Sequence, residues 1–141
     1  MEPVDFSDLP RDALVLVGSA PIIYVLEDHS TLAPRFMPLF EAHAAGRLRF
    51  ATTTITIAEV LTGPMKAGDE ALVQRYRVIL ESWRSVALDV DIAESAARLR
   101  GSLRLSLAGA VQVASALAIN AAALVTHDRD FSRVRSLRIL S

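Results

Sequence analysis

Cysteine is absent from this sequence of 141 residues, which excludes disulfide bonds and metal sites built from thiolates. Lysine is nearly absent, because only Lys66 among the 15 basic residues is a lysine and the others are arginines. A large excess of charge is also lacking, and the net charge of −1 gives no overall attraction to nucleic acid. Arginine binds phosphate through paired hydrogen bonds, so local contacts with phosphate remain open.

Long hydrophobic runs are missing as well. No apolar stretch reaches the roughly 20 residues that a membrane-spanning helix needs. The first residues, Met1 to Asp5, lack the basic and apolar pattern of a signal peptide. We therefore expect a cytoplasmic protein with no membrane partner.

The sequence is rich in material for a hydrophobic core. Hydrophobic residues make up 52% of the chain, enough for one domain to fold without disulfides or a structural metal. The length predicts a single domain over residues 1–141. Residues 1–11 are polar and contain two prolines, so we expect a loose lead-in there.

Short aliphatic runs alternate with helical patterns along the chain. The runs predict strands near residues 13–17, 48–53, 86–90, 122–126 and 137–140. The intervening patterns predict helices over residues 19–27, 31–45, 56–63, 69–83, 91–104 and 106–120, with a short helix near Asp130. This alternation predicts an α/β fold, a three-layer α/β/α sandwich with a central, mostly parallel sheet of about five strands.

Several polar residues have the spacing of helix caps. Ser19 is a candidate cap for the first helix, where Pro21 fits the first turn. Thr56 and Glu59 have the spacing of a capping box, and this helix is expected to stop at Gly63–Pro64. Asp91 repeats the capping-box spacing ahead of an alanine-rich helix. Glu59 therefore has a purely structural interpretation.

Three separate segments are expected at one edge of the sheet. Gly18, the turn from Thr53 to Glu59, and the segment Thr126 to Asp128 each follow a predicted strand. Ligands of open parallel sheets bind at the carboxyl ends of the strands. The sequence therefore predicts one cleft lined by all three segments.

Four segments carry a resemblance to a known family. They are Leu14–Tyr24, Thr54–Leu61, Leu105–Leu117 and Leu124–Phe131, and their order and spacing extend over nearly the whole chain. The chain resembles a PIN domain, in particular the VapC-like toxins of bacterial type II toxin–antitoxin pairs. The resemblance implies the PIN fold and metal-assisted hydrolysis of RNA, in which Mg²⁺ or Mn²⁺ held by carboxylates activates water.

The resemblance places four acidic positions, of which two are acids here. Glu59 and Asp128 match acids of the family and are the implied catalytic and metal-binding residues. Gly18 and Gly109 stand where the family has aspartates that bind the metal. Loss of one well-placed electrostatic group typically slows a reaction ~10²–10³-fold. We therefore expect impaired or lost catalysis, as in a pseudoenzyme, and doubtful binding of Mg²⁺ or Mn²⁺.

Each of these residues also has a plain structural interpretation. Gly18 fits a turn that needs a positive φ or a close approach of the backbone. Asp128 fits the cap of the short helix that follows it. Ser19, Thr126 and Asp130 are implied to contact substrate or bound water. For Ser19 and Thr126 we favour capping or a structural place at the strand end, and Asp130 has a spacing that would let it substitute for Asp128.

Three functions remain open from the sequence. The first is a VapC-like protein with impaired ribonuclease chemistry. The second is an active, metal-dependent endoribonuclease toxin that uses Glu59 and Asp128. The third is a non-catalytic module that binds RNA or protein. The resemblance implies RNA, an antitoxin-like protein and a second copy of the chain, in a homodimer, as partners.

Overall fold

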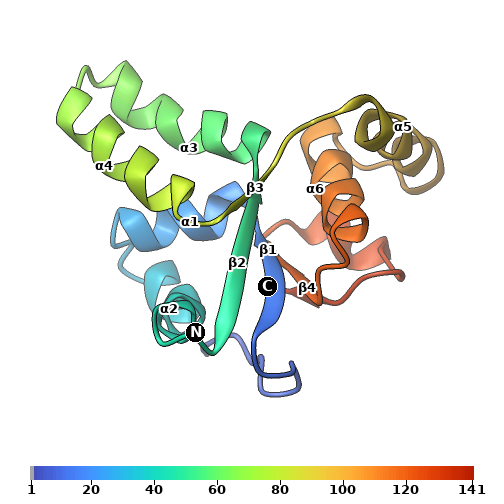
Figure 1. Ribbon diagram of the computed structural model, residues 1–141, viewed down its shortest axis with the longest axis horizontal. Coiled ribbons are helices and arrows are strands. Elements are labelled where there is room, and N and C mark those ends of the chain that lie inside the picture. The colour runs from blue at the N-terminus through green and yellow to red at the C-terminus, as the bar shows by residue number, and fades with distance from the viewer. Residues whose placement is uncertain (1) are drawn as a thin grey trace.

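A single parallel sheet organises the protein in the computed structural model, which describes residues 2–141 (Figure 1). Its five strands lie in the order β3-β2-β1-β4-β5, and every neighbouring pair is parallel. The strands are β1 (Ala13–Val17), β2 (Leu48–Thr53), β3 (Arg84–Val86), β4 (Ala123–Val125) and β5 (Ile139–Leu140). The predicted α/β class and sheet are confirmed, and the sheet is wholly rather than mostly parallel.

Helices cover both faces of the sheet (Figure 1). The helices of residues 2–141 are α1 (Ser19–Leu26), α2 (Leu32–Ala44), α3 (Thr54–Lys66), α4 (Glu70–Glu81), α5 (Val90–Leu103), α6 (Leu107–Ala118) and the short 3₁₀ helix η1 (Arg129–Arg133). Helices α1 to α4 lie on one side, and α5 and α6 pack against each other on the other. This arrangement gives the three layers that the sequence predicts.

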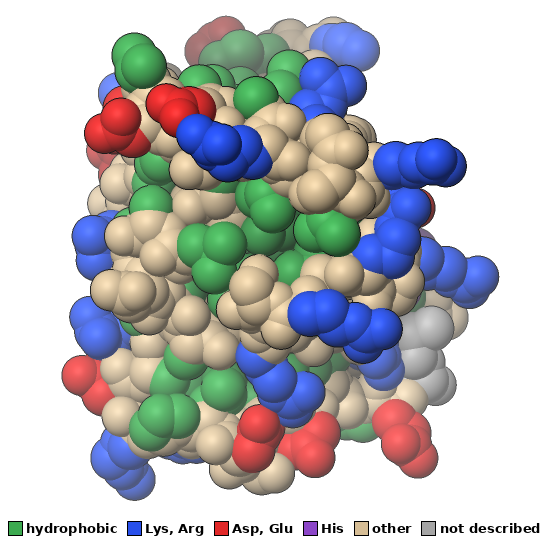
Figure 2. Space-filling view, turned by 90° about the vertical axis from the view of Figure 1, so that its right-hand side faces the viewer, with side chains coloured by type: hydrophobic (Ala, Val, Ile, Leu, Met, Phe, Trp, Pro, Cys, Tyr) green, Lys and Arg blue, Asp and Glu red, His purple; other side chains and the backbone are tan. Residues whose placement is uncertain are grey.

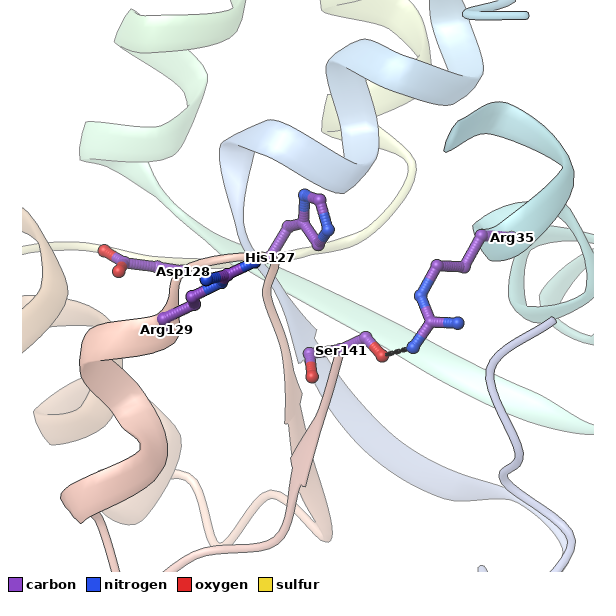
Figure 3. A pocket seen from close by; sticks show the side chains of 5 residues that line it. All are labelled: Arg35, His127, Asp128, Arg129 and Ser141. Carbon is purple, nitrogen blue, oxygen red and sulfur yellow. Dashed lines mark hydrogen bonds between the residues drawn. The ribbon is translucent and has the colours of Figure 1, made fainter. Parts of the chain in front are cut away.

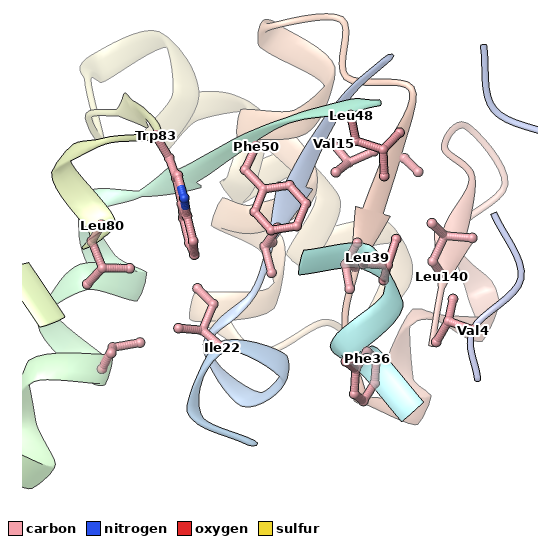
Figure 4. Close-up of a cluster of buried hydrophobic side chains, with 14 of the residues drawn as sticks. Val4, Val15, Ile22, Phe36, Leu39, Leu48, Phe50, Leu80, Trp83 and Leu140 are labelled. Atoms are coloured by element: carbon pink, nitrogen blue, oxygen red, sulfur yellow. The ribbon is translucent and has the colours of Figure 1, made fainter. Parts of the chain in front are cut away.

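Alternate residues of β1 contribute to two hydrophobic cores, one on each face of the sheet. Val15 and Val17 belong to the core under α1 to α4, whereas Leu14 and Leu16 belong to the core under α5 and α6. All five residues of β1 are buried, as expected for a central strand covered on both faces. Figure 4 shows the first core, where Phe50 of β2 lies among side chains from the sheet and helices.

Two predicted boundaries on the third strand are wrong. The strand spans Arg84–Val86, and Val90 already begins α5. The cap of α5 is Asp89, whose carboxylate accepts the amide N–H of Ile92 at 2.8 Å, and not Asp91. Aspartates stand two residues apart in this sequence, so capping spacing alone did not distinguish them.

Two predicted helix ends also differ from the structure. Helix α3 is capped by Thr53, whose hydroxyl accepts the amide N–H of Thr56 at 3.0 Å, so the helix begins earlier than expected. It then continues through Gly63 and Pro64 to Lys66. Pro64 is buried and lies in the last turn, where its missing N–H removes only one helical hydrogen bond.

Residues ahead of β1 are held against the body of the protein, contrary to the expected loose lead-in. Val4 and Leu9 are buried in the first core. The amide N–H of Val4 donates to the carbonyl oxygen of Arg35 at 3.0 Å. The Arg47 guanidinium donates to the carbonyl oxygens of Leu9 and Pro10. Among residues 2–141, no helix combines the length and apolar character needed to cross a bilayer.

Candidate functional site

A pocket of about 220 Å³ opens where β1 and β4 end. We call it the carboxyl-edge pocket. It is lined by Ser19, Ala20, Glu59, Ser106, Ala108, Gly109, Gln112, Thr126, Asp128 and Phe131. These residues come from α1, α3, α6 and the segment after β4, so distant parts of the sequence meet in one cavity.

Most of the residues singled out from the sequence line this pocket. Ser19 is the first residue of α1, and Glu59 comes from α3. Thr126 and Asp128 follow β4 directly. Asp130 is not among the lining residues and instead donates its amide N–H to Asp128 Oδ1 at 2.9 Å.

The two acids of the pocket differ in their local role. Asp128 caps η1 through the hydrogen bond from Asp130, so the capping interpretation of Asp128 is confirmed. Glu59 is not part of a capping box with Thr56, because the cap of α3 is Thr53. The structural explanation offered for Glu59 is therefore wrong, and its exposed carboxylate lines the pocket.

Gly18 does not adopt a conformation reserved for glycine. It is the cap residue of α1 with φ −80° and ψ 170°, which any residue can adopt. Its surroundings are nevertheless crowded. A Cβ atom at this position would lie 3.1 Å from Gln112 Oε1 and 3.2 Å from the carbonyl oxygen of Val125. A close approach, and not a positive φ, therefore distinguishes this glycine.

Gly109 is crowded in a similar way. Its amide N–H donates to the hydroxyl of Ser106, the cap of α6, at 3.0 Å. A Cβ atom at Gly109 would lie 3.0 Å from that hydroxyl oxygen and 3.2 Å from Cζ of Phe131. The Phe131 ring is almost fully buried, so it is held in place over the glycine. A side chain at either glycine would therefore require its neighbours to shift by a few tenths of an ångström.

Gln112 is the residue of the pocket that sequence reasoning missed. It lies on α6 three residues after Gly109, on the same side of the helix. Its side chain lines the pocket, and only 8% of the residue is exposed. The available signal was a lone carboxamide in an otherwise small and apolar helix.

A second pocket, of about 380 Å³, shares Asp128 with the first. We call it the arginine pocket, and Arg35, His127, Asp128, Arg129 and Ser141 line it. Figure 3 shows that His127 and Asp128 point to opposite sides of the chain after β4. The Arg35 guanidinium donates to the carbonyl oxygens of Glu2 and Ser141. These hydrogen bonds fix the Arg35 side chain beside the cavity.

His127 belongs to an aromatic cluster and not to the carboxyl-edge pocket. Its Nδ1 lies 3.2 Å from the Tyr24 hydroxyl oxygen. Its ring meets those of Tyr24 and Phe36 edge to face, with centroids 5.5 and 5.8 Å apart. The partly buried ring therefore has a packing role that connects the end of β4 to α1 and α2.

Basic side chains are unevenly distributed over the surface. Figure 2 shows the side of α5 and α6, where they gather mostly along one edge and hydrophobic side chains lie nearer the centre. Arg98 and Arg138 are engaged in exposed ion pairs with Glu94 and Asp8, respectively. Arg129 has no such pair among residues 2–141 and faces the arginine pocket.

Carboxylates do not cluster in the part of the chain that the structure describes. Within residues 2–141, no three His, Asp or Glu side chains lie close enough together to hold a metal ion. The carboxyl-edge pocket is lined by two carboxylates, Glu59 and Asp128, and its other polar side chains are the hydroxyls of Ser19, Ser106 and Thr126 and the Gln112 carboxamide.

Comparison with solved structures shows the same fold in known proteins. A toxin–antitoxin complex from Klebsiella pneumoniae superimposes with a TM-score of 0.71 and 24% identity over 90% of this chain and 96% of that chain. VapBC2 from Rickettsia felis, bound to a DNA fragment from its promoter, gives 0.70 and 20% identity over 89% and 96%. VapC20 from Mycobacterium tuberculosis, a toxin that cleaves the sarcin–ricin loop, gives 0.66 and 15% identity over 84% and 92%.

Sequence comparison identifies the family. No curated protein matches the chain. The family model of the PIN domain matches residues 16–137, which include the end of β1 and the whole of β2, β3 and β4. The match begins within β1 and ends just before β5, so it covers every segment of the carboxyl-edge pocket. This chain belongs to the PIN domain family.

Proposed function

We propose that this chain is a VapC-like member of the PIN family whose metal-dependent hydrolysis of RNA is impaired or lost. One observation supports the proposal. The resemblance implies aspartates at Gly18 and Gly109, and a Cβ atom there would lie 3.1 Å from Gln112 Oε1 and 3.2 Å from Phe131 Cζ, respectively. A side chain at either position would therefore require these neighbours to shift by a few tenths of an ångström.

The donor set of the pocket supports impaired chemistry. Mg²⁺ and Mn²⁺ prefer oxygen ligands, and carboxylates neutralise most of their charge. Glu59 and Asp128 are the two carboxylates that line the pocket, and both are exposed. The first residues of α1 and α6 also line the pocket, and the partial positive charge of a helix N-terminus disfavours a cation there. These residues do not fit the implied metal centre, so we derive no hydrolytic step through a metal.

The partners that we propose for this chain rest on the family resemblance and on the solved structures with a similar fold. The solved relatives include a toxin–antitoxin complex and a toxin that acts on RNA. We propose that this chain likewise binds an antitoxin-like protein, self-associates as a homodimer and contacts RNA in the cytoplasm. Arg35 and Arg129 of the arginine pocket are the cations nearest to Asp128 for contacts with RNA phosphates.

An active ribonuclease is the second candidate, and one observation favours it. Glu59 and Asp128 line one pocket although they lie far apart in the sequence. Mg²⁺ often takes one or two protein carboxylates and completes its shell with water and phosphate. In this alternative the two acids hold the metal, and Ser19 and Thr126 contact the substrate.

Cleavage of RNA separates the two candidates. A labelled RNA is incubated with the wild type and with Glu59→Gln/Asp128→Asn, with Mn²⁺ or Mg²⁺ and with EDTA. Impaired catalysis predicts that both proteins match the blank without protein. EDTA-sensitive cleavage by the wild type that disappears in the double variant would establish the active alternative. A known ribonuclease on the same RNA serves as the positive control.

A further inference from the structure

Hydrogen-bond donors dominate the inner wall of the carboxyl-edge pocket. Ser19 and Ala20 begin α1, and Ala108 and Gly109 lie in the first turn of α6. The first N–H groups of a helix have no partner within the helix and carry a partial positive charge. Helix α1 has no side-chain cap, because its cap residue is Gly18. Two helix N-termini therefore meet at one cavity.

Gln112 is an independent sign that a polar group belongs in this pocket. The residue is more than nine-tenths buried, its side chain lines the cavity, and its carboxamide takes part in none of the side-chain hydrogen bonds among residues 2–141. Its polar atoms are open to the cavity, since Ser115 Oγ is the one fully buried side-chain oxygen or nitrogen of residues 2–141 that lacks a hydrogen bond. The Gln112 carboxamide adjoins Gly18, beside the start of α1. A ligand between the two helix ends would therefore lie within reach of this carboxamide.

We propose that the inner wall binds a phosphate-type oxyanion directly, without a metal ion, through Gln112 Nε2 and the amides of Ser19, Ala20 and Ala108. The Gly109 amide is not counted, because it already donates to Ser106 Oγ. The hydroxyl of Ser19 supplies a further donor in the same cavity. The inference rests on the proposed function, since aspartates at positions 18 and 109 would repel the same anion. A pocket of about 220 Å³ leaves room for a tetrahedral oxyanion and water.

The carboxylates of Glu59 and Asp128 repel an anion, and this repulsion distinguishes an anion site from a cation site. Both carboxylates line the pocket and are exposed, so water and salt weaken their repulsion. They lower the affinity for phosphate but would raise the affinity for a cation. Neutralising them therefore has opposite effects on the two kinds of site.

Inorganic phosphate is the probe for the test. It is titrated into the full chain by NMR and calorimetry, with EDTA present to remove divalent ions. We expect saturable binding with the largest amide shifts at Ser19, Ala20 and Ala108. Gln112→Leu should weaken binding about tenfold or more, the range for a hydrogen bond to a charged group. Gln74→Leu replaces an exposed glutamine of α4 and should leave binding unchanged.

Two further variants change the negative charge of the pocket in opposite directions. Glu59→Gln/Asp128→Asn should bind phosphate more tightly than the wild type. Gln112→Glu keeps the shape of the side chain, adds a third carboxylate, and should lose phosphate binding while gaining binding of Mn²⁺. Circular dichroism confirms the fold of each variant, and Gln112→Ala serves if Gln112→Leu does not fold.

The source of the phosphate is distinguished by competition. A free nucleotide or phosphate ligand predicts that a 5′-mononucleotide displaces phosphate as well as a short single-stranded RNA does. A nucleic-acid backbone predicts that only the RNA binds more tightly than phosphate. Absence of saturable binding by all three probes, or an unchanged affinity in Gln112→Leu, overturns the inference. If either result is obtained and the protein does not cleave RNA, only the phosphate site is wrong and the proposed function stands. Mn²⁺-dependent cleavage of RNA by the wild type would instead overturn the proposed function.

Discussion

A single added methyl group tests whether the space at Gly109 is filled. In Gly109→Ala, the new Cβ would lie 3.0 Å from Ser106 Oγ and 3.2 Å from Phe131 Cζ. Alanine in place of glycine favours a helix by about 1 kcal/mol. Against this, displacing the Ser106 cap costs about 1 kcal/mol, and overpacking the buried Phe131 ring costs roughly 1–3 kcal/mol. We expect a net destabilisation of about 1–2 kcal/mol.

The chain offers a matched control for this change. Gly101 lies within α5, and no atom stands within 4 Å of the position that its Cβ would take. Gly101→Ala should therefore stabilise the protein by up to about 1 kcal/mol. Urea unfolding of both variants gives the two free energies of unfolding. If Gly109→Ala stabilises the protein as much as Gly101→Ala does, the contact with Ser106 and Phe131 does not restrict this site.

Three other predictions concern the cap of α3, a surface ion pair and the arginine pocket. Thr53→Val removes the hydroxyl that accepts the amide N–H of Thr56, and urea unfolding should show a loss of about 1 kcal/mol; an unchanged stability would exclude this cap as a source of stability. Arg138→Ala breaks an exposed pair with Asp8 and should change the unfolding free energy by at most about 1 kcal/mol. That effect should shrink at high salt, and an effect that grows with salt would exclude an electrostatic origin. Arg129→Ala should weaken binding of single-stranded RNA and reduce the slope of log affinity against log salt by about 0.7. An unchanged slope would mean that Arg129 contacts no phosphate.

The arrangement of strands and helices followed from local patterns in the sequence. The aliphatic run of β1 is long enough to identify a strand buried on both faces, and parallel order follows from the helices between strands. That order brings the ends of β1 and β4 together, which is why Gly18, the turn from Thr53 to Glu59 and the segment Thr126 to Asp128 were predicted to line one cleft. Glu59, Thr126 and Asp128 do line one pocket, whereas Gly18 is not among its lining residues. Boundaries were less certain, because Asp89 and Asp91 have the same local capacity to cap α5.

The side chains that lie next to Gly18 and Gly109 could not be predicted from the sequence. Glycine at positions 18 and 109 reveals what is absent, but not which neighbour occupies the space. Phe131 lies over Gly109 because η1 folds back towards α6, and that contact depends on tertiary packing. The orientation of Gln112 depends on how α6 packs against the end of β1, which the sequence alone does not define. The structure therefore adds the neighbours of Gly18 and Gly109, which the sequence alone did not identify.

Calorimetric titration of Mn²⁺ into the wild-type protein tests the central claim most directly. The account predicts no saturable binding at millimolar Mn²⁺, because two exposed carboxylates line the pocket together with the first residues of α1 and α6 and the Gln112 carboxamide. Stoichiometric binding of Mn²⁺ by the wild type that disappears in Glu59→Gln would contradict the claim that this pocket has lost its metal site.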